Sequence, residues 1–175
     1  MASSDSISRA NAPCHPFLAF LNTVSDDGKT RTENIFGNKA QLCDILTAAG
    51  VDLGPKAAER MDLAMLIAFR EAAFRTLSAY AAKRTPSDAD MHAVESILKR
   101  ALASGEFHLD RNGFQVTPHP DGGVIDHLAL QYIDLVNGPE FYRLKECQRC
   151  TKLFLDHGRG RGRRWCDMAL CGNRA

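Results

Sequence analysis

The sequence predicts a mainly helical protein with a minor β component: a helical N-terminal domain that carries one small β-hairpin, followed by a short cysteine-rich C-terminal unit. Three observations predict this class. Apolar residues recur at three- and four-residue spacing over several long stretches, as expected for helices with one buried face. One stretch around Asn112-Gly113 alternates polar and apolar residues, which is typical of a hairpin. Four of the six cysteines form two close pairs near the C-terminus.

The helical domain is predicted at residues 13–142, after a terminus (residues 1–12) that lacks periodicity and is expected to be flexible. The apolar run at residues 17–24 fits either a helix or a strand. Asn38 is the expected N-cap of the next helix, and Gly50 should end it. Its expected buried face consists of Leu42, Ile45, Leu46 and Ala49.

The longest periodic stretch, from Pro55 to about Arg84, predicts the central helix. Its expected buried stripe consists of Met61, Met65, Ala68, Phe69, Ala72, Thr76, Leu77 and Tyr80. Thr85 is the expected cap of the following helix, with Pro86 at its first position and an end near Gly105. The buried face predicted for that helix consists of Met91, Val94, Leu98, Ala101 and Leu102.

A β-hairpin is expected at residues 106–117 and a last helix at residues 125–136, where Asn137-Gly138-Pro139 breaks the pattern. No run of about eighteen apolar residues is present, and the first twelve residues lack the apolar segment of a secretory signal. We therefore expect a cytoplasmic protein with no membrane association. In that reducing compartment cysteines are metal ligands or buried thiols more often than disulfides.

The two cysteine pairs predict a metal site. Two residues separate Cys147 from Cys150, and four separate Cys166 from Cys171. Such close pairs let tight turns present their sulfurs to one ion, and four thiolates complete the tetrahedral shell of Zn²⁺. We expect one structural Zn²⁺ in a treble-clef or zinc-ribbon-like finger at residues 143–175. His157 is the other possible ligand, but a histidine in this polar loop is expected to be solvated.

Charge is divided unevenly along the chain. From residue 143 onward nine basic and three acidic residues give a formal charge of +6, whereas the rest of the chain carries −5. Four thiolates with one Zn²⁺ would lower the charge of the finger to about +4. An excess of this kind favours contact with phosphates. The candidate nucleic-acid contacts are Arg149, Lys152, Arg159, Arg161, Arg163, Arg164 and Arg174.

Several other residues have a structural and a functional interpretation. Trp165 could stack on a base, but packing in the small core of the finger is favoured. Gly172 and Asn173 are expected to shape the last turn around the sulfurs. Asn22, a polar residue in an apolar run, could line a ligand pocket, although a capping role is favoured. The sequence shows no phosphate-binding glycine loop, nucleophile elbow or clustered acidic pair, so we do not expect an enzyme.

The finger sequence closely resembles a known family. The run from Arg143 to Cys150, the segment Arg163–Met168 and the closing Cys171-Gly172-Asn173-Arg174 resemble the CGNR zinc finger, named for that tetrapeptide. The run Leu18–Thr23, followed by helical hairpins, looks like the ABATE domain, which precedes this finger in bacterial proteins described as stress-induced transcription regulators. The resemblance implies that the four cysteines bind zinc and that the finger contacts DNA.

Two functions from different classes follow. The first is a transcription regulator that binds DNA through the finger, with a helical domain that senses a small-molecule signal or forms a homodimer. The alternative is a zinc-stabilised protein-interaction or ligand-binding module without nucleic-acid binding. Finger arginines paired with acids of the helical domain would favour the alternative, whereas exposed arginines would favour DNA.

Overall fold

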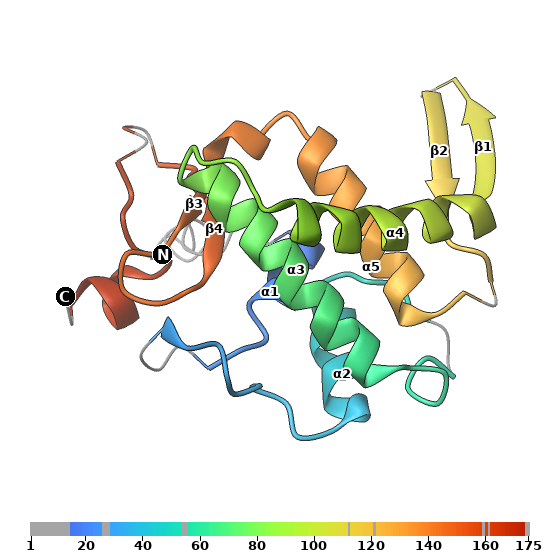
Figure 1. The fold of residues 1–175 in the computed structure, drawn as a ribbon, viewed down its shortest axis with the longest axis horizontal. Coiled ribbons are helices and arrows are strands. Elements are labelled where there is room, and N and C mark those ends of the chain that lie inside the picture. Colours follow the sequence, from blue (N-terminus) through green and yellow to red (C-terminus); the bar gives the residue numbers. More distant parts are fainter. Residues whose placement is uncertain are drawn as a thin grey trace, which may run out of the picture.

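The computed structural model describes residues 15–25, 29–53, 56–111, 113–120, 122–158, 160 and 162–173. The mainly helical class is confirmed (Figure 1). The predicted flexible terminus, residues 1–12, lies outside the described residues. The elements in chain order are α1 (Pro16–Leu21), α2 (Lys39–Ala48), α3 (Leu63–Ala81), α4 (Asp88–Ser104), β1 (Glu106–Asp110), β2 (Gly113–Thr117), α5 (Val124–Asn137), the 3-10 turn η2 (Phe141–Arg143), β3 (Leu144–Glu146), β4 (Leu153–Leu155) and the π-helical turn η3 (Met168–Gly172).

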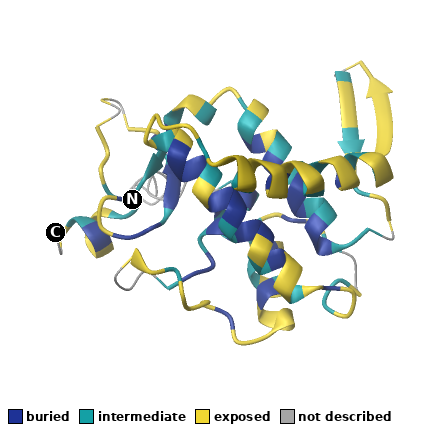
Figure 2. Cartoon of the chain, in the orientation of Figure 1, coloured by how far each residue is buried: buried dark blue, intermediate teal, exposed yellow. Residues whose placement is uncertain are grey.

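The ambiguous run after residue 16 is a short helix, α1, at the centre of the core. Pro16 occupies its first turn, and His15 Nδ1 accepts a hydrogen bond from Phe17 N at 3.2 Å. A helix of six residues is too short to be stable alone. Packing against α2, α3 and α5 stabilises it, and the Phe17 ring lies 5.8 Å from that of Phe69 and 5.1 Å from that of Tyr132. Figure 2 shows that burial concentrates where these helices meet.

Helix α2 has the predicted cap and end. Asn38 Oδ1 accepts a hydrogen bond from Gln41 N at 3.0 Å, and Gly50 adopts a left-handed φ of 92° just past the helix. Leu42 and Leu46 are buried as expected. The capping chemistry of the sequence therefore predicted both boundaries within one residue.

Helix α3 differs from the prediction in its start and in its buried surface. It begins at Leu63 because Asp62 Oδ1 caps Met65 N at 3.0 Å; Pro55 lies outside the described residues. Within the predicted stripe, Met65, Ala68 and Tyr80 are exposed. Helix α3 packs against α1, α4 and β3, so residues off one stripe are buried as well: Leu66, Arg70, Ala73, Phe74 and Ser78.

Helix α4 begins later than predicted and has a narrower buried face. Ser87, not Thr85, is the N-cap, and its Oγ accepts a hydrogen bond from Asp90 N at 3.2 Å. Val94 and Ala101 are buried, whereas Met91 is 47% exposed. Helix α4 contacts α3 and α5, and most of its residues are exposed (Figure 2).

The predicted hairpin is confirmed and lies at one edge of the helical domain, where β2 contacts α5. Strands β1 and β2 pair antiparallel, and the hairpin projects from the end of α4 (Figure 1). Phe107, Leu109 and Phe114 are 57%, 82% and 63% exposed.

The chain then enters α5, where Asp126 Oδ2 accepts a hydrogen bond from Gly123 N at 2.9 Å. None of the described helices combines the length and the hydropathy needed to cross a bilayer.

Candidate metal centre

The first cysteine pair lies in the turn of a small hairpin. Strands β3 and β4 pair with Leu144 opposite Leu155 and Glu146 opposite Leu153. Cys147 N donates to Lys152 O at 2.9 Å, which closes the turn that holds Cys147 and Cys150. Both cysteines are 1% exposed. The short hairpin thus presents two sulfurs from one tight turn, as the spacing predicted.

The second pair is shaped by η3. Cys166 precedes this turn, and Cys171 N donates to Asp167 O at 2.9 Å. The Asp167 side chain caps the turn by accepting from Leu170 N at 2.7 Å. A Cβ on Gly172 would lie 2.7 Å from Cδ1 of Trp165, so only glycine leaves room for the indole there. Trp165 packs against the small cluster formed by the cysteines and Phe154.

The four sulfurs have the geometry of a tetrahedral metal site. All four lie within 4.8 Å of one another. The Cys150–Cys166, Cys166–Cys171 and Cys171–Cys150 distances are 3.6, 3.7 and 3.8 Å. Four sulfurs bound at about 2.3 Å to one Zn²⁺ in a tetrahedron would lie about 3.8 Å apart. The donor set and its spacing therefore fit one structural Zn²⁺ site with a complete shell.

The protonation of the cluster also fits a cation. Hydrogen bonding from Cys166 lowers the pKa of Cys150 to about 5, while its bond to Cys150 raises the pKa of Cys166. Burial raises the pKa of Cys171 to about 11. Four adjacent thiolates without a cation would repel one another. A divalent cation removes that repulsion, and its binding releases protons.

His157 lies outside the sulfur cluster. Its Nδ1 is 3.3 Å from Glu140 Oε1, and its side chain is 42% exposed. This position agrees with the expectation that the His157 side chain is solvated. The four cysteines form the cluster without it.

Three of the described candidate nucleic-acid residues, all arginines, are bonded to the finger itself. Arg149 Nη1 donates to Leu170 O at 3.1 Å, and Arg164 Nε donates to Gln148 Oε1 at 2.7 Å. Arg163 Nε donates to Trp165 O at 2.8 Å, and its Nη2 donates to Cys166 O. These three arginines are exposed, and Lys152 is half-buried. Arg159, Arg161 and Arg174 lie outside the described residues.

Asp156 anchors the basic loop where it leaves β4. Its carboxylate is buried and accepts from Lys145 Nζ at 2.7 Å, Gly158 N at 2.9 Å and Arg163 N at 3.2 Å. Burial alone would raise the pKa of Asp156, but the hydrogen bonds from these donors outweigh it, and the pKa lies below its usual value. The carboxylate therefore stays ionised and holds both ends of the loop.

Two family models match the chain, one in the helical domain and one in the finger. The model of the ABATE family, described as a "putative stress-induced transcription regulator", matches residues 14–139. The chain belongs to the ABATE family. The CGNR zinc-finger model matches residues 143–175. The ABATE and CGNR descriptions are of regulator and zinc-finger types rather than enzymes. The comparison with curated proteins gave no match.

In this ABATE-family chain the CGNR finger shares the core of the helical domain. Leu144 and Leu153, from β3 and β4, belong to the main core cluster together with Phe17 and Leu128. Ser78 on α3 also donates a hydrogen bond to the Glu146 carboxylate. The finger is therefore packed against the helices rather than tethered to them.

Two polar residues of the ABATE domain join it to the finger, and the sequence did not predict this role for either. The backbone of Asn22 occupies the C-cap position of α1, as the favoured capping role predicted, while its side chain pairs with the backbone of Leu153. Arg31 Nη1 donates to Thr151 Oγ1 at 3.3 Å. Asn22 was marked as unusual by its apolar neighbours, whereas nothing in the sequence around Arg31 distinguished it.

Proposed function

We propose that the chain is a zinc-stabilised transcription regulator whose finger binds DNA. The observation that supports this most is the placement of Arg149, Arg163 and Arg164, which are exposed beside the zinc site and held by bonds within the finger. A guanidinium has five N–H donors, so each of these arginines retains donors for phosphate. Side chains that are already ordered lose less entropy when they bind.

The proposed contacts position the finger on DNA without reading its sequence. Phosphate contacts from arginine and lysine supply affinity and register, whereas base edges supply specificity. The +6 formal charge of the residues from 143 onward supports an electrostatic role. We propose that Lys152, Arg159, Arg161 and Arg174 add to the same surface, and that the protein acts in the cytoplasm.

The helical domain would supply regulation by a small-molecule signal or by homodimerisation. A cavity of about 220 Å³ between α3, α4 and α5 is lined by Asp62, Met65, Arg100, Val124 and Asp126, among others. Its mixture of apolar and charged groups supports a small polar ligand. The exposed apolar side chains of the β1–β2 hairpin support self-association instead.

The second candidate function is a zinc-stabilised interaction module that binds no nucleic acid. The docking of the finger on α1 and α3 favours it, because Leu144, Leu153 and Thr151 already contact the helical domain. Against it, the contacts described above for Arg149, Arg163 and Arg164 are with groups of the finger and leave these side chains exposed.

Salt-dependent binding to duplex DNA separates these functions. About four phosphate contacts should give a slope of log affinity against log salt of roughly −3 to −4. Arg149→Ala should weaken binding and reduce the slope by about 1. Arg111→Ala, the same change at the exposed hairpin, is the control and should leave both unchanged. A slope near zero, or an equal loss for the two variants, would favour the interaction module.

A further inference from the structure

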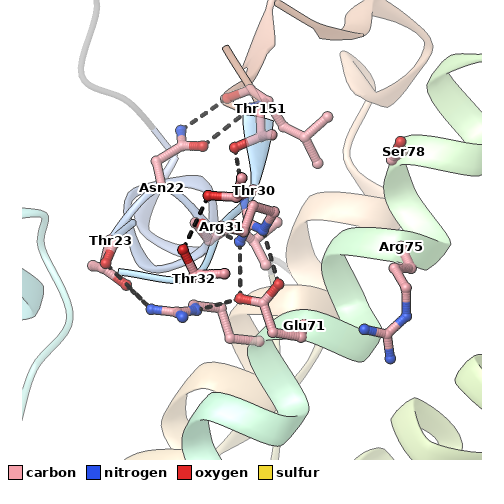
Figure 3. A network of polar contacts seen from close by, with 12 residues as sticks. Asn22, Thr23, Thr30, Arg31, Thr32, Glu71, Arg75, Ser78 and Thr151 are labelled. Atoms are coloured by element: carbon pink, nitrogen blue, oxygen red, sulfur yellow. Dashed lines mark hydrogen bonds and ion pairs between the residues drawn. The ribbon is translucent and has the colours of Figure 1, made fainter. Parts of the chain in front are cut away.

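Arg31 links the turn that holds Cys147 and Cys150, here called the first zinc knuckle, to two helices of the ABATE domain. Its guanidinium donates to the Glu71 carboxylate on α3 at 2.8 and 3.2 Å. The same group donates to Leu21 O at the end of α1 at 2.8 Å and to Thr151 Oγ1 at 3.3 Å. Thr151 directly follows the ligand Cys150. Figure 3 shows Arg31 between Glu71 and Thr151.

The surroundings of Arg31 fix its side chain in place. The guanidinium carbon lies 3.7 Å from the centroid of the Phe74 ring, and the side chain is 6% exposed. Glu71 also accepts from Arg70 Nε at 2.8 Å, and Arg70 Nη1 donates to Thr23 Oγ1 at 3.0 Å. The turn that holds Cys147 and Cys150 is therefore connected, through Arg31, Glu71 and Arg70, to Thr23 in the segment that follows α1.

The backbone of Arg31 indicates that this position is held by its contacts. Its φ of 54° lies in the left-handed region, which is unfavourable for a residue with a Cβ. Such a conformation persists where the surrounding structure over-determines it. The bonds to Glu71, Leu21 and Thr151 provide that constraint.

We propose that Arg31 is a positioning residue for the zinc site, so that zinc binding by the finger and ordering of residues 16–25 and 29–35 of the ABATE domain are coupled. By holding Thr151 against α1 and α3, Arg31 fixes the turn that carries Cys147 and Cys150 before the metal binds. A preorganised pair of ligands binds with a smaller loss of entropy. Coupling of this kind is reciprocal, so zinc stabilises the Arg31 contacts to the same extent. The inference concerns the zinc site and does not depend on DNA binding.

The first test compares two arginine variants of the full chain. Arg31→Asn removes the guanidinium, and asparagine tolerates the left-handed backbone. Arg75→Asn is the matched control: Arg75 lies on the same helix as Glu71 and pairs with Asp90, and its side chain points away from the Arg31 contacts (Figure 3). Zinc affinity is measured by competition with a chelator of known affinity, and the urea midpoint of each zinc-bound variant is recorded alongside.

Arg31→Asn should weaken zinc binding roughly 10- to 100-fold, as loss of residues that orient metal ligands does, while Arg75→Asn should change it less than about twofold. Equal affinities for wild type and Arg31→Asn would overturn the proposal. An equal loss in both variants would also overturn it, because that result would reflect general destabilisation.

The second test uses the wild-type protein and remains decisive if Arg31→Asn does not fold. Zinc is removed by a chelator, and amide hydrogen exchange is compared with that of the zinc-bound protein. The amides of Thr23 and Ile35, which donate to Phe20 O and Thr23 O, should lose protection together with the finger. The amide of Met91, bonded to Ser87 O in α4, should keep its protection. Exchange changes confined to residues 144–173 would overturn the proposal.

Discussion

The side-chain amide of Asn22 pairs with both backbone groups of Leu153: Asn22 Nδ2 donates to Leu153 O at 2.9 Å, and Leu153 N donates to Asn22 Oδ1 at 3.0 Å. One amide thus substitutes for a neighbouring strand along the edge of β4. Because Leu153 is fully buried, its polar backbone groups would otherwise lack partners. The pairing explains why a polar residue ends the apolar run of α1.

Asn22→Asp should destabilise the zinc-bound protein by about 1–3 kcal/mol at neutral pH. The carboxylate can still accept from Leu153 N, but it cannot donate to Leu153 O and would place negative charge beside it. Urea unfolding measures the effect. Gln115→Glu, the same change from amide to carboxylate on an exposed strand residue, is the control. Similar losses for the two variants would contradict the assigned role.

Cys171→Ser should lower zinc affinity by a factor on the order of 100, because a quarter of the ligand set is lost from a site whose binding supplies folding energy. Wild type should contain one zinc per chain by elemental analysis. Cys43→Ser is the matched control, because Cys43 lies on α2 outside the four-sulfur cluster. A zinc content lowered equally by both changes would argue against the four-cysteine site.

Arg163 and Arg164 should differ although they are neighbours. Arg163 bonds to Trp165 O and Cys166 O, so Arg163→Ala should cost about 1–3 kcal/mol of stability. The ring contacts of the two arginines do not distinguish them, since Arg163 lies 5.1 Å from the Phe154 centroid and Arg164 5.0 Å from that of Trp165. Arg164→Ala should cost less than about 0.5 kcal/mol while reducing the salt slope of DNA binding by about 1. Urea unfolding and DNA titration on the same samples separate these effects. Equal stability losses would refute the distinction.

The contribution of Asp156 should depend on pH. Because its folded pKa lies below the usual value, its stabilising effect is present above about pH 4 and is lost as the pH falls through the folded pKa. Asp156→Asn should therefore be less stable than wild type by about 1–3 kcal/mol at neutral pH, and the difference should shrink below about pH 4.

Urea unfolding of wild type and Asp156→Asn at matched pH values measures that difference, since both carry the same zinc site. Asp44→Asn, at an exposed position on α2, is the control and should show no such trend. A difference that stays constant down to low pH would rule out an ionised Asp156 as its source.

Local chemistry made much of this fold predictable. Asn38 predicted the start of α2 and Gly50 predicted its end. The cysteine spacing predicted a metal site, and the four sulfurs lie at separations that fit a tetrahedron. The start of α3 was missed because the prediction followed the apolar stripe back to Pro55, although Asp62 is a residue type that caps helices. Burial of Arg70 and exposure of Met65 depend on which elements surround α3, and that is a property of the tertiary structure.

The contacts between the helices and the finger could not be predicted either, because they too depend on the tertiary structure. Asn22 and Leu153 are 131 positions apart, and Arg31 and Thr151 are 120 apart. No local pattern relates such residues. The candidate arginines were recognised by composition, but composition did not indicate that Arg163 holds the carbonyl groups beside Cys166.

The presence of Leu144 and Leu153 in the same core as Phe17 limits how this finger can be exchanged. A CGNR finger grafted from a relative would have to match the surface formed by α1 and α3, and its fifth residue after β3, the position of Thr151, would have to face Arg31. We therefore expect coordinated substitutions in the two parts of the chain. Changes near Asn22 and Arg31 should be accompanied by changes near Thr151 and Leu153.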